Sequence, residues 1–213
     1  MISPNDFLLF AFASLVLNIT PGNDMLYVAT RSASQGVKAG IVSALGIAGG
    51  CIVHLLAAVI GLSAIIANSA IAFDIIKYVG AAYLIYLGIR SFLSNQNKFN
   101  VSNSVEKKSL SKLFWQGVFT NVLNPKVALF FLAFLPQFIH PEKGNAALQI
   151  LLLGLWFNFS GTIVNIIVAM LFGKLGNWLA DKQASIKWQN KITGLLLVGL
   201  GIKVALSSRK SLC

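Results

Sequence analysis

Charged residues are scarce in this chain of 213 residues. Only 11% are charged and 56% are hydrophobic, with a mean hydropathy of +0.77, whereas a soluble domain has roughly one quarter charged residues. Charged residues are wholly absent from segments 39–73 and 144–173. Each segment exceeds the roughly 20 residues that a helix needs to cross a bilayer. This composition excludes a soluble globular domain and indicates a membrane protein.

Cysteine is nearly absent as well. Cys51 lies inside an apolar run and Cys213 ends the chain, so the sequence offers neither a disulfide framework nor a cysteine metal cluster. We expect no metal and no cofactor. The segment Met1–Asp6 contains no Lys or Arg, which argues against a secretory signal and favours a first membrane span.

The apolar runs predict an all-α polytopic membrane protein with six transmembrane helices. The predicted spans are 7–29, 41–67, 71–92, 113–139, 147–172 and 191–207.

The basic residues, which give a net charge of +11, lie in alternate loops and at span ends. This placement is typical of membrane topology rather than of nucleic-acid binding. Loops rich in Lys and Arg face the cytoplasm, so both termini of a six-span chain are predicted to be periplasmic. The basic residues on the cytoplasmic side are Arg31, Lys38, Lys98, Lys107, Lys108, Lys112, Lys174, Lys182, Lys187 and Lys191.

Proline is also rare, with five residues, yet Pro21 and Pro125 lie inside predicted spans. A proline within a helix lacks an N–H and frees the carbonyl four residues before it, here that of Leu17 or Asn121. Thr20 and Asn124 precede the prolines and suit helix N-caps. The sequence therefore predicts that helices 1 and 4 are broken and restart at these positions.

The two breaks belong to a predicted internal repeat. Segment 77–90 contains Gly80 and Leu-Gly-Ile-Arg, and segment 191–203 contains Gly194 and Leu-Gly-Ile-Lys. Two units of three spans each enter the membrane from opposite sides, which gives two inverted repeats, a common plan of secondary transporters. The whole chain, 1–213, is then one membrane domain. Repeat one covers about 5–93, a cytoplasmic linker about 94–112 and repeat two about 113–207.

Polar residues inside the spans are the candidate site residues. Asp24 follows the first break and fits either a substrate or proton role or a helix cap; Lys126 follows the second and fits a substrate carboxylate, a partner for Asp24, or a side chain reaching the interface. His54 fits a packed hydrogen-bonding residue or a proton relay.

Several amides and glycines complete the candidates. Asn18 and Asn121 precede the breaks and either satisfy the freed carbonyls or face a ligand. Asn158, Thr162 and Asn165 form a polar stripe at helical spacing. Gly46 and Gly50 lie one turn apart, so that a neighbouring helix can approach closely. The expected substrate-binding set is Asn18, Pro21, Gly22, Asp24, Asn121, Asn124, Pro125, Lys126 and Asn158, with Asp24 and His54 coupling protons.

Several motifs occur in a characteristic order and spacing: Thr20-Pro-Gly-Asn-Asp24, segments 36–40 and 80–88, and 121–126 followed by Phe134-Leu-Pro-Gln-Phe138. In these motifs the chain resembles the LysE/RhtB amino-acid exporters. It implies export of homoserine, its lactone, threonine, leucine or related compounds across the bacterial inner membrane. Asn23 stands where the family often has another proline.

We expect a zwitterionic amino acid to bind between the broken helices, its carboxylate near Lys126 and its ammonium near Asp24. The chain has no ATP-binding motif, so exchange for protons is the expected energy source. A divalent-cation exporter would need more carboxylates, and an intramembrane enzyme would need a nucleophile or metal-ligand set. Membrane lipid surrounds the protein, and a homo-oligomer is left open.

Overall fold

The structure is a computed structural model that describes residues 2–68, 70–93 and 107–180, together with 191, 194–195, 198–199, 201–202 and 205. These described residues form helices and no strand. The predicted linker 94–112 and the predicted sixth span, 191–207, lie mostly outside them. Leu110–Lys112, assigned to the linker, already belong to a helix.

The first predicted span consists of two helices. Helix α1 (Pro4–Ile19) begins with Ser3 as N-cap, whose Oγ accepts the Asp6 N–H at 3.1 Å, and with Pro4 in its first turn. Helix α2 (Asn23–Gln35) is bent from α1 by 51°. Gly36, at φ +86°, then reverses the chain into α3, a conformation that favours glycine.

The second predicted span is one long helical stretch. It comprises α3 (Val37–Ala57), the π-helical segment η1 (Ala58–Leu62) and α4 (Ser63–Asn68). The next helix, α5 (Ala70–Leu93), begins beyond Ser69, as the sequence predicted.

The fourth predicted span is again broken. Helix α6 (Leu110–Val122) is bent by 47° from a second half that runs to Phe138. That half contains α7 (Pro125–Leu129), the π-helical η2 (Phe130–Phe134) and the 3-10 segment η3 (Leu135–Phe138). After the short 3-10 segment η4 (Pro141–Lys143), α8 (Ala146–Ala180) extends eight residues beyond the predicted end of the fifth span.

Two helical stretches of the described residues are long and apolar enough to cross a membrane, namely Val37–Ile65 and Ala146–Lys174. The number of spans rises to four if the bent pair α1–α2 and the bent pair that begins with α6 each form one span. Helix α5 occupies the predicted third span but is not among these four. The six-span arrangement with inverted repeats stays a prediction.

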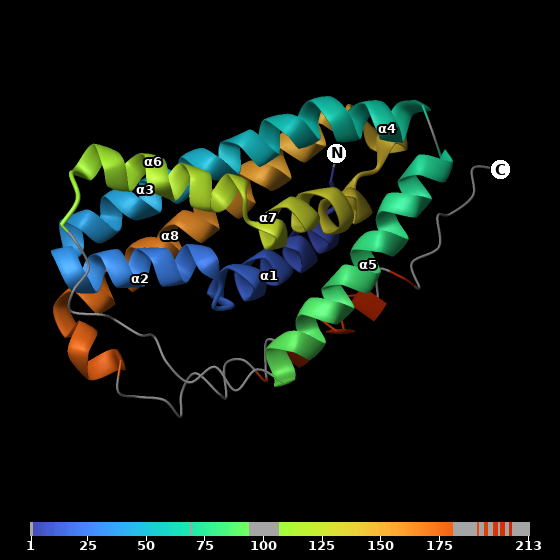
Figure 1. Ribbon diagram of the computed structural model, residues 1–213. Helices are drawn as coiled ribbons and strands as arrows, with labels where there is room; N and C mark the ends of the chain where they lie inside the picture. Colours follow the sequence, from blue (N-terminus) through green and yellow to red (C-terminus); the bar gives the residue numbers. More distant parts are fainter. Residues whose placement is uncertain are drawn as a thin grey trace.

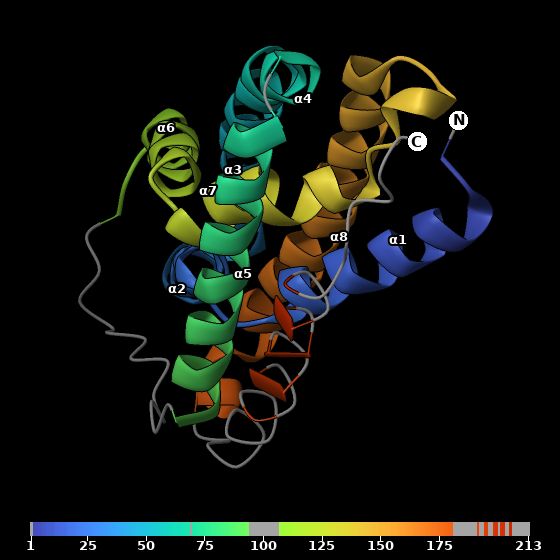
Figure 2. The ribbon, with the colours of Figure 1, turned by 90° about the vertical axis from the view of Figure 1, so that its right-hand side faces the viewer.

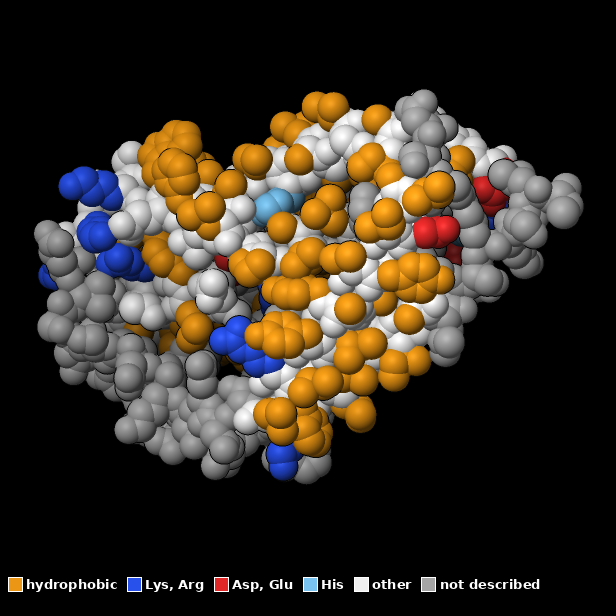
Figure 3. All heavy atoms as spheres, turned by 45° about the vertical axis from the view of Figure 1, so that its right-hand side comes forward, with side chains coloured by type: hydrophobic (Ala, Val, Ile, Leu, Met, Phe, Trp, Pro, Cys, Tyr) orange, Lys and Arg blue, Asp and Glu red, His pale blue; other side chains and the backbone are white. Residues whose placement is uncertain are grey.

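The helices pack side by side around two apolar clusters. Helix α3 contacts α2, α6 and α8, while α5 lies at the edge of the bundle and contacts η2 (Figures 1 and 2). One cluster is rich in phenylalanine and joins α1, η2, η3 and α8; the other joins α2, α3 and α8. Figure 3 shows apolar side chains over much of the visible face and a group of Lys and Arg side chains at one end. This surface suits a lipid environment.

Candidate functional site

The first break lies between α1 and α2 and differs from the prediction. Thr20 is the C-cap of α1, not the N-cap of α2: its hydroxyl donates to the Val16 carbonyl at 2.7 Å. Its N–H also bonds the Leu17 carbonyl at 3.2 Å, which is the carbonyl that Pro21 leaves free. Helix α2 restarts two residues later than predicted, after Gly22, because the chain at Gly22 is fully extended and not helical. No side chain caps α2, so its first-turn N–H groups have no side-chain acceptor.

The second break follows the prediction. Asn124 caps α7, its Oδ1 accepting the Lys126 N–H at 3.0 Å, and Pro125 is the first helical residue. The Asn121 carbonyl accepts the Asn124 N–H at 2.9 Å and a hydrogen bond from His54 Nε2 at 3.0 Å. The ring of His54 also stacks on Phe131, with centroids 6.2 Å apart.

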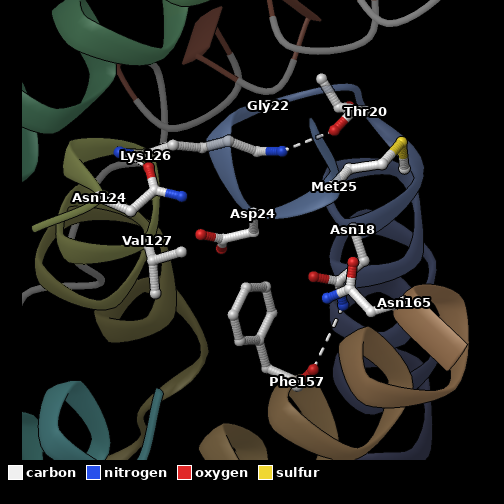
Figure 4. Close-up of a pocket in the computed structure, with 10 residues that line it drawn as sticks. All are labelled: Asn18, Thr20, Gly22, Asp24, Met25, Asn124, Lys126, Val127, Phe157 and Asn165. Atoms are coloured by element: carbon white, nitrogen blue, oxygen red, sulfur yellow. Dashed lines mark hydrogen bonds between the residues drawn. The ribbon is translucent and has the colours of Figure 1, made fainter. Parts of the chain in front are cut away.

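A small pocket of about 30 Å³ lies between the two breaks (Figure 4). It receives side chains from α1, α2, α7 and α8. The lining residues are Asn18, Thr20, Gly22, Asp24, Met25, Asn124, Lys126, Val127, Phe157 and Asn165.

Lys126 reaches across the pocket from α7 to the end of α1. Its Nζ donates to the Thr20 carbonyl at 2.9 Å. This carbonyl belongs to the negative end of the α1 dipole, which attracts a cation. Gly22 borders the lysine side chain: a Cβ at this position would lie 3.5 Å from Nζ, in ordinary van der Waals contact.

Asp24 lies in the first turn of α2. Its Oδ2 accepts the Asn121 Nδ2–H at 2.8 Å, while Oδ1 is buried and has no hydrogen-bond partner among the described residues. The two ion pairs within the described part of the chain both involve His140, so Asp24 and Lys126 do not pair directly. The pocket thus holds a cation with a backbone partner and a carboxylate with one free oxygen.

The predicted asparagines differ in whether they line the pocket and in which helices they join. Asn18 Nδ2 donates to the Phe157 carbonyl at 3.2 Å and to Ser160 Oγ at 3.1 Å, so it joins α1 to α8 and does not satisfy the freed Leu17 carbonyl. Asn165 lines the pocket, whereas Asn158 of the same stripe does not.

Four further predicted site residues do not line the pocket. Pro21, Pro125, Asn121 and His54 are not among its lining residues, although Asn121 holds Asp24. The sequence did not single out Met25, Val127 and Phe157. Met25 and Val127 directly follow the charged pair and could have been inferred from it, but Phe157 is one of 15 phenylalanines without a distinguishing pattern.

Sequence comparisons relate the chain to known membrane proteins. The family model described as LysE type translocator matches residues 15–208. The chain is 36% identical over 197 residues to YrhP of Bacillus subtilis, described as an uncharacterized membrane protein, covering 89% of this chain and 93% of that protein. It is 30% identical over 196 residues to a homoserine/homoserine lactone efflux protein of Salmonella typhimurium, covering 92% and 94%. No solved structure matches the chain. These matches and the apolar helices show a multi-pass membrane protein.

Proposed function

The chain belongs to the LysE type translocator family, and from this premise we propose that it is a secondary transporter exporting amino acids or close derivatives from the bacterial cytoplasm. The proposed substrates are of the homoserine, homoserine lactone, threonine and leucine class. A Salmonella relative is named for homoserine and homoserine lactone efflux.

The observation that carries this proposal is the pair of opposite charges around one pocket. Lys126 and the uncapped N-terminus of α2 supply positive charge, and Asp24 Oδ1 supplies an unpartnered negative oxygen. An amino acid carries both an ammonium and a carboxylate, and a pocket with two separated opposite charges complements both.

We propose that the carboxylate of an amino-acid substrate, or the ester carbonyl of a lactone, binds the first-turn N–H groups of α2 and Lys126. Lys126 then releases the Thr20 carbonyl. The ammonium binds Asp24 Oδ1 and the released carbonyl. Asn18 and Asn165 then face the substrate side chain, together with Phe157 and Val127.

Alternating access is proposed to come from rocking of one repeat against the other. Contacts between α5 and the last segment support the inverted repeat. A Cβ at Gly88 would lie 2.7 Å from the Gly194 carbonyl, and a Cβ at Gly201 would lie 2.9 Å from the Ala81 carbonyl. The sequence repeat aligns Gly80 with Gly194 and Gly88 with Gly201, so the two contacts are near-equivalents of each other, as a two-fold relation requires.

Proton exchange is the proposed energy source, with Asp24 as the coupling carboxylate in the pocket. The proposed location is the bacterial inner membrane with both termini periplasmic. A divalent-cation exporter gains no support from geometry, because the described residues contain no group of three or more His, Cys, Asp or Glu side chains that could hold a metal ion.

Inverted membrane vesicles test the proposal, because export from the cytoplasm becomes uptake. Vesicles that contain the protein should accumulate at least one labelled amino acid of the proposed class above vesicles without it, and collapse of the pH gradient should abolish the accumulation. If a full amino-acid panel shows no difference from control vesicles, the proposed function is wrong. If accumulation survives collapse of the gradient, only the proton coupling is wrong.

A further inference from the structure

Helix α3 presents a stripe of three residues, each four positions apart, to helix α6. The residues are Gly46, Gly50 and His54. At Gly46 a Cβ would overlap the Phe114 carbonyl oxygen, and at Gly50 it would lie 2.5 Å from the Val118 carbonyl oxygen and 2.8 Å from the Cβ of Asn121. No side chain larger than hydrogen fits at either position, so the two backbones approach closely. This approach brings the His54 ring to the end of α6.

His54 meets the backbone carbonyl that Pro125 leaves without its helical donor. In an unbroken helix the N–H of residue 125 would donate to the Asn121 carbonyl, but proline has no N–H. His54 Nε2 lies 3.0 Å from this carbonyl. A carbonyl can only accept, so Nε2 carries the hydrogen, as it does in one neutral tautomer and in the charged imidazolium.

The same asparagine holds the carboxylate in the pocket. Asn121 is 2% exposed, and its Nδ2 donates to Asp24 Oδ2 at 2.8 Å. A continuous path therefore runs from α3 through the backbone and side chain of Asn121 to the first turn of α2. The free oxygen of Asp24 depends for its position on this path.

We propose that His54 is a positioning residue, which replaces the N–H missing at Pro125 and thereby fixes Asn121 and the Asp24 carboxylate. The inference rests on the proposed function for its transport readout. In this role His54 does not carry the transported proton. The hydrogen-bond path from His54 through Asn121 ends at Asp24, which is the proposed proton carrier. Loss of the donor leaves a buried carbonyl without its second partner, and the end of α6 is free to move.

Two substitutions test the N–H donor of His54 and its aromatic ring independently of each other. His54→Phe keeps an aromatic ring against Phe131 but removes the donor, whereas His54→Gln removes the ring and places an amide N–H near the position of Nε2. We expect His54→Phe to reduce uptake into inverted vesicles at least about fivefold, the effect of losing one buried hydrogen bond. His54→Gln should recover most of it, with the pH profile of wild type.

The background of Pro125→Ala gives the sharper test. Alanine restores an N–H at residue 125, which can bond the Asn121 carbonyl. In this background His54→Phe should cause no further loss of transport, because the carbonyl no longer needs His54. Thermal unfolding of the purified proteins in detergent should show the same coupling without any substrate.

Equal losses from His54→Phe in both backgrounds would overturn the proposal, as would a His54→Gln protein that is inactive or has a shifted pH profile. The unfolding cycle keeps the test independent of the substrate. If wild type transports no amino acid but the cycle shows coupling, the proposed function fails and the positioning role stands. If wild type transports and no coupling appears, the positioning role fails.

Discussion

The two helix breaks come from similar sequence but differ in how their backbone groups are satisfied. At the first break, Thr20 closes α1 with its own hydroxyl and N–H, and the chain passes through an extended Gly22 to an uncapped α2. At the second, the Asn124 side chain caps α7, and the freed Asn121 carbonyl has two donors, from Asn124 and His54.

The two breaks therefore supply different groups. The first break places the uncapped start of α2, the Thr20 carbonyl bonded by Lys126, and the buried, unpartnered Asp24 Oδ1 around the pocket. The second break is satisfied within the protein and supplies side chains, namely Lys126 to the Thr20 carbonyl and Asn121 to Asp24. The similar sequences at the two breaks are therefore satisfied in different ways.

The largest effect is expected from Asp24→Asn at the first break. The amide oxygen can still accept from Asn121, so the fold should be kept, but an NH₂ group replaces the free oxygen and repels a substrate ammonium. We expect transport to fall by roughly a hundredfold, since hydrogen bonds to charged groups contribute about 1.5–3 kcal/mol. Uptake into inverted vesicles, normalised to protein level, measures it.

Asp74→Asn is the matched control, because Asp74 lies on α5 and does not line the pocket. It should leave transport near wild type. Normal transport by correctly inserted Asp24→Asn protein would leave Asp24 as a helix cap only.

Pro21→Ala and Pro125→Ala test whether the breaks are equivalent. Pro21 is the one residue of the first break that cannot donate a helical hydrogen bond, so alanine at 21 should let α1 and α2 join. In Pro125→Ala, residue 125 regains an N–H for the Asn121 carbonyl, but the Asn124 cap and the non-helical Leu123 oppose a complete joining of α6 and α7. We expect transport to fall roughly tenfold for Pro21→Ala and about threefold for Pro125→Ala, because a proline is incompatible with a helix interior and alanine is not. Equal losses, measured by the same uptake assay, would mean that the breaks contribute alike.

The positions of the breaks could be predicted from the sequence because proline acts locally. Its missing N–H and its clash with the preceding turn require no knowledge of neighbouring helices. For the same reason Asn124 could be identified as a cap. The prediction for Thr20 was wrong because threonine can also bond back to the carbonyl four residues earlier, and Gly22 permits an extended link that sequence pattern does not distinguish from a helix start.

The partners of the polar residues depend on packing between distant helices. Asn18 and Asn121 occupy matching places in the sequence, yet one joins α8 and the other α2 and α3. Lys126 meets a carbonyl and not Asp24, because α1 ends where the lysine can reach it. Such choices depend on the crossing of helices that are far apart in the chain, for instance at His54 and Asn121, 67 residues apart, and at Asn18 and Phe157, 139 residues apart. A single sequence does not specify them.

The smallest expected effect is a difference in protein stability between substitutions at the starts of α7 and α2. Asn124→Ala removes the side chain that caps α7 and should lower the free energy of unfolding by about 1 kcal/mol. Gly22→Ala should change it by less than about 0.5 kcal/mol, because the start of α2 has no side-chain cap to lose and an extended backbone accepts any residue. Thermal unfolding in detergent measures both.

The added methyl group of Gly22→Ala would lie 3.5 Å from Lys126 Nζ, so this variant should instead weaken substrate affinity by a few-fold, seen as a higher half-saturating concentration. A Gly22→Ala protein that is less stable than Asn124→Ala would show that the extended link at Gly22 contributes more to stability than the Asn124 cap.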